Sequence, residues 1–341
     1  MRNTIGKILI VILLPLSACI ERLDVSVVPE DSFVLVSANV TDDQAANVNI
    51  SILSGEQETL VNGASVMIID NLGNEFTLDH QGSGEYTTEN SIGVVGRSYS
   101  LKIALDNGST YSSTFEEIVP VPEVDTFFID TATEVVLNDS GNEEIVERWQ
   151  ILVRTQTINE EGTYLRWKYT GLAQVFYNAD LPCWFNHDGP ENFLNVFGSD
   201  ELRAGEAIDH TLIILGSNGI YENYNLFLRQ MSLNPNAFRY WSSIQQQREN
   251  TVGFFEEQPA NIVGNIQNDT NPDEVVLGYF TVSSVARKTF VFNKFKIPIL
   301  LDNAALDIWP ADCFEGPPPL SCFDCRAVGG VSAVPPNWIF P

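Results

Sequence analysis

Residues 64–78 read ASVMIIDNLGNEFTL, and this stretch predicts two β-strands joined by a turn. Residues 64–70 are rich in the β-branched side chains that favour strands, and residues 75–78 continue in the same way. Between them, residues 71–74 contain the Asn and Gly typical of tight turns. The local pattern is therefore that of an antiparallel hairpin.

The same pattern repeats on both sides of this hairpin. Strand-like segments lie at residues 33–40, 48–53, 84–88, 98–105 and 110–115, separated by Gly, Asn and Asp. About seven short strands at a spacing of roughly ten residues are typical of a β-sandwich. Residues 32–119 are therefore predicted to form an immunoglobulin-like β-sandwich.

A second, larger region follows the proline-containing linker at residues 119–122. Strands are expected on both sides of residues 138–142, and again at 149–157 and 163–171, with a turn at 160–162. One helix is expected from Pro235 to about Gln247, because Asn234 suits the N-cap and Pro235 the first helical position. Residues 123–341 are thus predicted to be a mainly-β domain with one or a few short helices, which makes the chain all-β.

The N-terminus carries the features of a lipoprotein export signal. Arg2 and Lys7 precede an apolar run at residues 8–14, which is too short to span a bilayer. Residues 16–18 then read LSA before Cys19, the pattern of a lipobox, in which the Cys receives the lipid. We expect a signal peptide at 1–18 and a lipidated tether at 19–31, whose last twelve residues reach at most about 40 Å.

Charge restricts the partners of the chain. It has 18 Lys and Arg against 45 Asp and Glu, a net charge of −27. Such a chain is repelled by nucleic acid, so no nucleic-acid partner is predicted. The acidity is explained by solubility at an exposed surface, or by attraction of cations and basic peptides.

No motif in the sequence predicts catalysis, a metal or a cofactor. His80, His187 and His210 include no H-E-x-x-H pair, and the chain has neither a G-x-S-x-G elbow nor a Walker-type phosphate loop. Paired carboxylates are expected by chance in so acidic a chain. The sequence therefore favours a protein that is not an enzyme and binds no cofactor.

Four cysteines follow Cys19, namely Cys183, Cys313, Cys322 and Cys325. An even number in an exported protein favours two disulfides that staple the C-terminal tail. We expect Cys313 to pair with one member of the C-x-x-C at 322–325, and Cys183 with the other. A zinc site or a redox pair is the alternative, although half a zinc ribbon in a Pro/Gly-rich tail suits neither well.

Aromatic residues are frequent in the second region. Residues 183–189 combine two aromatics with a His and an Asp beside a cysteine, which fits either a sugar- or peptide-binding surface or a pinned loop whose aromatics fill the core. A partner interface could use aromatics left exposed. The set considered comprises Trp184, Phe185, Phe193, Phe197, Tyr221, Tyr224 and Phe227.

Several short motifs, in this order, resemble the domain of unknown function 4249 family of Bacteroidota lipoproteins. Beyond the lipobox, they lie at residues 63–66, 84–86, 95–99, 163–167, 239–241, 259–266, 277–280, 322–326, 329–330 and 336–338. The family supplies no reaction. Its members are often genetically associated with TonB-dependent outer-membrane transporters, so the resemblance implies a compartment and a class of partner.

Two further expectations depend on this resemblance. Glu21 and Asp24 follow the lipid-bearing Cys, as acidic residues do in related proteins exported to the outer face, although Arg22 interrupts them. The chain is therefore expected on the outer membrane, facing the cell exterior. Asp130-Thr131-Ala132 is similar to the O-glycan acceptor of exported Bacteroidota proteins, which makes Thr131 a candidate for O-glycosylation.

These observations favour a non-enzymatic accessory or binding subunit of an outer-membrane β-barrel complex. The complex would serve TonB-dependent transport or a larger envelope assembly machine. A free-standing surface adhesin or glycan-binding module is the alternative, and a hydrolase whose site is invisible in one sequence is a third hypothesis.

Overall fold

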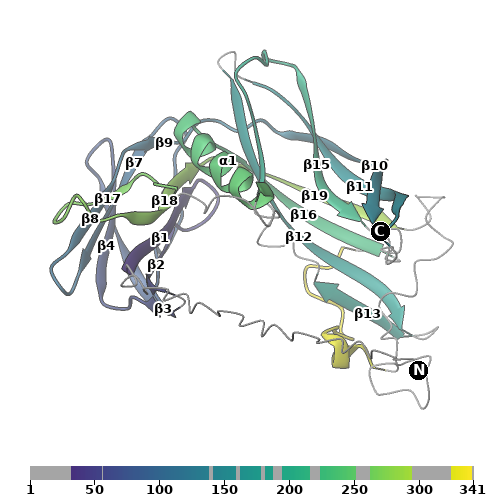
Figure 1. The fold of residues 1–341 in the computed structure, drawn as a ribbon, viewed down its shortest axis with the longest axis horizontal. Coiled ribbons are helices and arrows are strands. Elements are labelled where there is room, and N and C mark those ends of the chain that lie inside the picture. The colour runs from purple at the N-terminus through teal and green to yellow at the C-terminus, as the bar shows by residue number, and fades with distance from the viewer. Residues whose placement is uncertain are drawn as a thin grey trace, which may run out of the picture.

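A computed structural model describes residues 32–55, 57–137, 141–158, 162–177, 181–186, 194–215, 223–250, 262–293 and 324–339. The chain is mainly β, and α1 (Pro235–Asn250) is the one α-helix in these ranges. This confirms the all-β class with a short helix. Figure 1 shows the strands gathered into two bodies with α1 between them. No helix in these ranges is long and apolar enough to cross a membrane.

Eleven strands form the first sheet. They are β1 (Ser32–Thr41), β2 (Asn47–Ser54), β3 (Gln57–Leu60), β4 (Ala64–Asp70), β5 (Glu75–Gly82), β6 (Glu85–Thr87), β7 (Ser98–Leu105), β8 (Thr110–Ser113), β9 (Glu116–Glu117), β17 (Ile266–Asn268) and β18 (Val276–Ser283). Nine of them follow the order β17-β8-β7-β4-β5-β6-β2-β1-β18, while β3 pairs with β2 and β9 with β7. The strands at the two ends, β17 and β18, also contact each other, so this mixed sheet is nearly closed and barrel-like.

Two strands of this sheet come from beyond the linker. β18 pairs in parallel with β1 over eight residues, from Val34 opposite Val276 to Thr41 opposite Ser283, and β17 pairs with β8. A parallel pair needs a long connection, and here the whole second region supplies it. The first sheet therefore extends past residues 32–119 to include part of the chain after residue 262.

The core of the first sheet is a single cluster of buried aliphatic and aromatic side chains. Alternate residues of β1 and β2 point inward, with Val36, Val40 and Val48 fully buried. Phe280 and Val282 of β18 belong to the same cluster. β18 thus contributes both hydrogen bonds and apolar burial to the first sheet.

Two smaller antiparallel sheets form the second body. A three-stranded sheet has the order β10-β11-β15, and a five-stranded sheet has the order β13-β12-β16-β19 with β14 beside β12. Their strands are β10 (Val124–Leu137), β11 (Glu143–Gln156), β12 (Thr163–Tyr177), β13 (Leu181–Asn186), β14 (Asn195–Ser199), β15 (Ala207–Leu215), β16 (Asn223–Ser232) and β19 (Val285–Asn293). Buried residues of both sheets form one core, in which Phe127 stacks on Phe290 with ring centroids 5.2 Å apart.

Consecutive strands in this body do not all pair. The alternation at 149–157 and 163–171 correctly predicted strands, but the hairpin implied by the turn at 160–162 is wrong. β11 pairs with β10 and β15, whereas β12 pairs with β13, β14 and β16. The apolar faces of β11 and β12 meet across the core instead of lying side by side.

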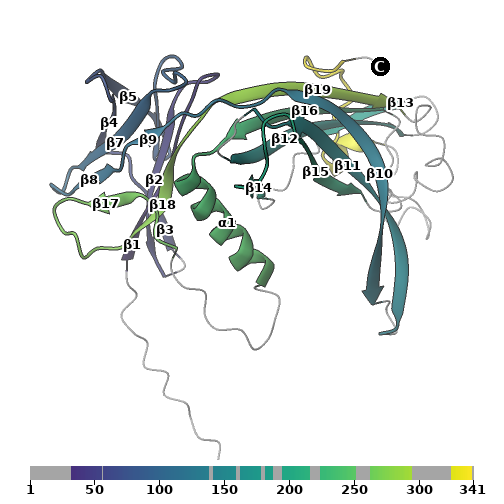
Figure 2. The same cartoon turned by 90° about the horizontal axis from the view of Figure 1, so that it is seen from above.

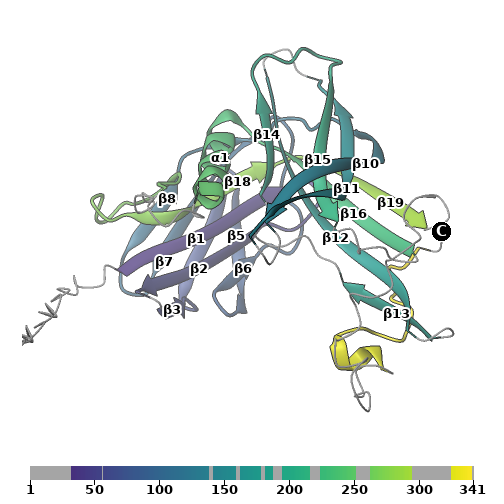
Figure 3. The ribbon, with the colours of Figure 1, turned by 45° about the vertical axis from the view of Figure 1, so that its right-hand side comes forward.

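Helix α1 agrees with its prediction. The side chain of Asn234 accepts a hydrogen bond from the amide of Ala237 at 2.9 Å, as an N-cap should. The apolar face of the helix packs into a cluster with Leu194, Val196, Leu233 and Tyr279. Figure 3 shows α1 standing between the first sheet and the five-stranded sheet.

Candidate functional site

The junction beneath α1 brings together four of the motifs on which the family resemblance rests. Tyr164 of β12 packs on Phe238 with centroids 4.9 Å apart. Tyr240 packs on Tyr279 of β18 with centroids 4.6 Å apart. Asn265 donates a hydrogen bond to the carbonyl of residue 280 at 3.0 Å. Segments from four distant parts of the chain therefore meet at one place.

A buried carboxylate ties this junction together. Glu116 of β9 is 2% exposed. It accepts hydrogen bonds from Asn234 at the start of α1, from Asn265 at 3.0 Å and from Tyr279 at 3.2 Å. Among the described residues only neutral donors contact Glu116, which thus links the first sheet, the helix cap and β18 without an ion pair in this part of the chain.

Arg166 is the least expected residue at the junction. Its guanidinium carbon lies 3.7 Å from the ring centroid of Trp241, a stacked cation–π contact. Its side chain is half-buried, and burial lowers the pKa of Arg166 to about 10. The group stays charged at neutral pH. Within the described residues, its N–H groups have no hydrogen-bond acceptor.

Further basic residues lie on the same face of the five-stranded sheet. Lys168 is opposite Arg229 across β12 and β16, and Arg229 is opposite Arg287 across β16 and β19. Asp43 of the first sheet bridges the two arginines, at 2.9 Å from Arg229 and 2.6 Å from Arg287. Hydrogen bonds and the charge of these arginines lower the pKa of Asp43 against the opposing effect of burial. This bridge also joins the two bodies.

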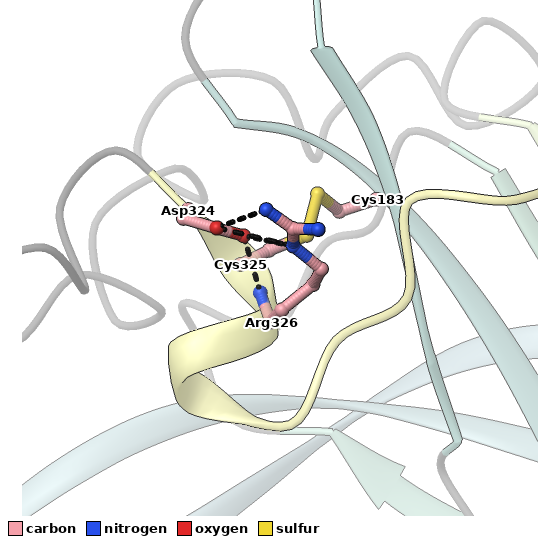
Figure 4. The surroundings of a disulfide bond; sticks show 4 residues. All are labelled: Cys183, Asp324, Cys325 and Arg326. Atoms are coloured by element: carbon pink, nitrogen blue, oxygen red, sulfur yellow. Dashed lines mark hydrogen bonds and ion pairs between the residues drawn. A yellow bond between two sulfur atoms is a disulfide. The ribbon is translucent and has the colours of Figure 1, made fainter.

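The C-terminal tail is stapled to the other end of the five-stranded sheet. A disulfide joins Cys183 of β13 to Cys325 of the 3-10 helix η4 (Cys325–Val328), as Figure 4 shows. Of the two partners predicted for Cys183, the structure selects Cys325. Asp324 caps this helix and pairs with Arg326, whose charge and hydrogen bonds lower the pKa of Asp324 to about 2.

The tail covers an aromatic cluster. Trp184 and Val331 exchange backbone hydrogen bonds at 2.9 Å, and the rings of Trp184 and Trp338 lie edge to face. Trp184 is only 3% exposed and packs with Leu172 and Phe227. This part of residues 183–189 is therefore core beneath the tail, and the structure does not support a sugar- or peptide-binding surface at Trp184.

The other predicted site residues either lie away from the junction beneath α1 or fall outside the described ranges. Cys19, Cys313, Cys322 and His187 lie outside them. Thr131 is on β10, half-buried, and its amide donates to the side chain of Asp130 at 2.8 Å. Its glycosylation stays a prediction. No group of three metal-ligating side chains occurs within the described residues.

A cavity of about 540 Å³ lies between the linker and the start of β12, a volume that suits a small ligand. Its lining is mostly apolar and comprises Val119, Pro120, Pro122, Ile158, Gly162, Thr163, Tyr164, Leu165, Leu233 and Pro235. The lining contains no pair of groups that could act as general acid and base.

His210 of β15 is half-buried in the second body, with its Nε2 atom shielded from solvent. Its ring stacks on Trp167 with centroids 4.3 Å apart, and its Nε2 has no hydrogen-bond partner within the described residues. Burial lowers the pKa of His210 to about 4 from an ordinary 6.5. The folded protein therefore keeps this imidazole neutral at neutral pH.

This low pKa predicts acid sensitivity. Above pH 6.5 the contribution of His210 to stability is complete, and it is lost as the pH falls from 6.5 towards 4, because only the unfolded chain takes up the proton. The loss amounts to about 3 kcal/mol at roughly 1.4 kcal/mol per pH unit. Urea unfolding of wild type and His210→Phe at pH 7 and pH 4.5 measures it. The variant should lose clearly less stability on acidification, and equal losses would contradict the assignment.

A long hairpin projects from the second body. β15 pairs with β11 only as far as Trp149, whereas β10 and β11 stay paired to Leu137 opposite Glu143. Within the described residues, the outer part of this hairpin is thus a two-stranded ribbon, which extends away from the rest of the fold in Figure 2. We call residues 132–137 and 143–148 the arm.

The arm exposes large aliphatic side chains. Val135 is 61% exposed, Leu137 71% and Ile145 74%. Val135 is directly opposite Ile145, and Leu137 lies two residues further on the same face. By contrast, the described members of the aromatic set are buried or half-buried, so the expected exposed aromatics are not found among them. Exposed apolar surface comes from the arm instead.

Sequence reasoning missed Arg166, the basic residues beside it and the arm. Arg166 and Trp241 both lie in motifs on which the family resemblance rests, but nothing in the sequence indicates that their side chains stack. The alternation of the arm is visible in the sequence, but the point at which β15 stops pairing is not.

Fold and site together define a two-body, mainly-β protein whose C-terminal tail is joined to the second body by a disulfide. Residues 20–289 match the model of the domain of unknown function DUF4249, and the chain belongs to this family. No curated protein sequence matches the chain.

Proposed function

We propose that this chain is a lipid-anchored outer-membrane lipoprotein, acylated at Cys19 and facing the cell exterior, that acts as a non-enzymatic binding subunit of a β-barrel complex. The TonB-dependent class is the favoured partner, because the family resemblance implies it. The observation that carries the proposal is the arm, with its three exposed aliphatic side chains. A surface of this kind on an exported protein marks an interaction site.

The arm favours a protein partner on two grounds. A two-stranded ribbon has marginal stability in water, so contact with another surface would order it. Between residues 130 and 148 the sequence has six acidic residues and one Arg. This charge opposes insertion among anionic lipid head groups and opposes pairing with a second copy of the chain. A surface with apolar and basic side chains fits best.

The remaining parts of the proposal concern the fold. We interpret the first sheet as the expected immunoglobulin-like sandwich, enlarged by β17 and β18. β5 supports this interpretation, because its residues 75–78 pair with β4 and residues 79–82 pair with β6. A strand that changes partners halfway can carry the sheet from one layer to the other.

Affinity purification tests the proposed function. The native, tagged protein should co-elute with an outer-membrane β-barrel after mild detergent extraction. Replacing Val135, Leu137 and Ile145 together by Thr should weaken this association at least about 100-fold, since each buried aliphatic side chain contributes on the order of 1–2 kcal/mol. The matched control is Leu72→Thr, because Leu72 is 69% exposed on the first sheet.

Two results would contradict the proposal in different ways. If the wild-type protein elutes alone at native expression, the subunit function fails and the adhesin or glycan-binding alternative takes its place. If the barrel co-elutes equally with wild type and arm variant, the function stands but the arm is not its interface.

A further inference from the structure

The basic side chains of the five-stranded sheet form one continuous surface. Arg166 and Lys168 lie two residues apart on β12, so their side chains share a face. Lys168, Arg229 and Arg287 are directly opposite one another across three neighbouring strands. Asp43 contacts both arginines and Trp241 covers Arg166, which places all four on the face turned towards α1 and the first sheet. We call these four residues the basic face.

The basic face differs in charge from the rest of the molecule. The chain has 45 acidic residues against 18 Lys and Arg. Two of the four basic residues, Arg229 and Arg287, share the carboxylate of Asp43. Asp42 accepts hydrogen bonds from the hydroxyl of Ser284 at 2.6 Å and the amide of Val285 at 2.8 Å. It therefore binds the chain segment between β18 and β19.

Such a row carries an energetic penalty in the absence of a counterion. Like charges that lie directly opposite each other on neighbouring strands are destabilising. Asp43 offsets part of this repulsion by sharing its two oxygens between Arg229 and Arg287. An anion bound over the row would reduce the repulsion between neighbouring basic groups further.

Arg166 adds a fixed donor group to this surface. Stacking on Trp241 holds the guanidinium plane, and a half-buried guanidinium is normally hydrogen-bonded. In the described part of the chain no acceptor is aimed at it. A guanidinium fixed in this way presents paired N–H donors whose spacing matches the two oxygens of a carboxylate.

Aromatic groups border the basic face along the strands. Trp241 stands at the Arg166 end. At the other end the half-buried side chain of Phe227 lies two residues from Arg229 on the same face. Aromatic borders with basic groups between them suit a ligand that has both ring faces and negative charges.

We propose that the basic face binds a carboxylated oligosaccharide, with one carboxylate on Arg166 and others along Lys168, Arg229 and Arg287. Neighbouring strands are about 4.8 Å apart, which is close to the length of one sugar unit in a chain. Same-face side chains of an extended acidic peptide recur every ~6.7 Å, which fits the row less well. This inference does not depend on the β-barrel partner.

Calorimetric titration of the purified full-length protein in mild detergent tests the proposal. The probe is tetragalacturonate, with the neutral maltotetraose and the peptide acetyl-tetraglutamate amide as comparisons. Tetragalacturonate should bind, more weakly at high salt, and maltotetraose should not. Arg166→Gln should weaken binding at least about 10-fold, because it removes charge-assisted hydrogen bonds.

Lys288→Gln is the matched control. Lys288 is exposed and follows Arg287 on β19, so it points to the opposite face and its replacement changes the net charge equally. Thermal unfolding checks that each variant is folded, and Lys168→Gln replaces Arg166→Gln if the latter is not. The proposal is overturned if tetragalacturonate gives no heat, if Lys288→Gln weakens binding as much as the basic-face variants, or if tetraglutamate binds more tightly.

Discussion

Gly278→Ala should destabilise the protein by at least about 3 kcal/mol. Gly278 lies on β18 with φ +101°, a conformation that other residues rarely adopt, and an added Cβ would lie 1.9 Å from the carbonyl oxygen of Val36. That oxygen belongs to β1, the parallel partner of β18, so the clash cannot be relieved by turning a side chain. The pair must separate, and the core residues Phe280 and Val282 move with it.

Gly73→Ala provides the matched control for this effect. Gly73 has a similar φ of +85°, but nothing lies within 4 Å of its added Cβ. It should therefore lose only about 1 kcal/mol from backbone strain. Urea unfolding of both variants measures the difference. Equal losses would show that the close approach of β18 to β1 does not matter for stability.

Cys183→Ser should have the second large effect. The disulfide closes a loop with a sequence separation of 142 residues, and its loss should cost about 2–4 kcal/mol. Hydrogen bonds between Trp184 and Val331, one from Asn225 to the carbonyl of Ile339 at 3.0 Å, and the packing of Trp338 on Trp184 would remain. We expect the tail to detach before the sheets unfold, because its described residues, 324–339, contribute no strand to either sheet of the second body.

Limited trypsin digestion detects this detachment, since Arg326 lies beside Cys325 in the stapled segment. Without reductant, the variant should be cut at Arg326 much faster than wild type. Adding reductant to wild type should raise its rate to that of the variant. If reductant leaves the wild-type rate unchanged and the variant is cut no faster, the staple does not hold the tail.

Much of the local structure was predictable. Residues 64–70 and 75–78 form β4 and β5, joined by the expected turn. α1 starts at Pro235 behind the Asn234 cap, and its apolar face is buried. These features depend on residues within one or two turns of each other, so composition and periodicity carry the necessary information.

Pairing was predictable only in part. The β10–β11 hairpin was expected from the strands on both sides of residues 138–142, and its register follows from a short connection. The hairpin expected between β11 and β12 is wrong, because both strands bury their apolar faces by packing across a core. The alternation of apolar and polar residues indicates which face of a strand is buried. It does not indicate whether the next strand pairs with it in the same sheet or packs against it from the other sheet.

The sequence by itself determined the strands β1, β2, β4 to β8 and β10 to β12, the helix α1 with its cap, and the strongly acidic balance of the chain. Only the tertiary structure decided that β18 returns to pair with β1, that Cys183 bonds Cys325, and that Arg166, Lys168, Arg229 and Arg287 share one face. The physical reason is that register between segments far apart in the chain depends on the packing of whole sheets. Local propensity is set within a few residues and carries no record of those distant partners.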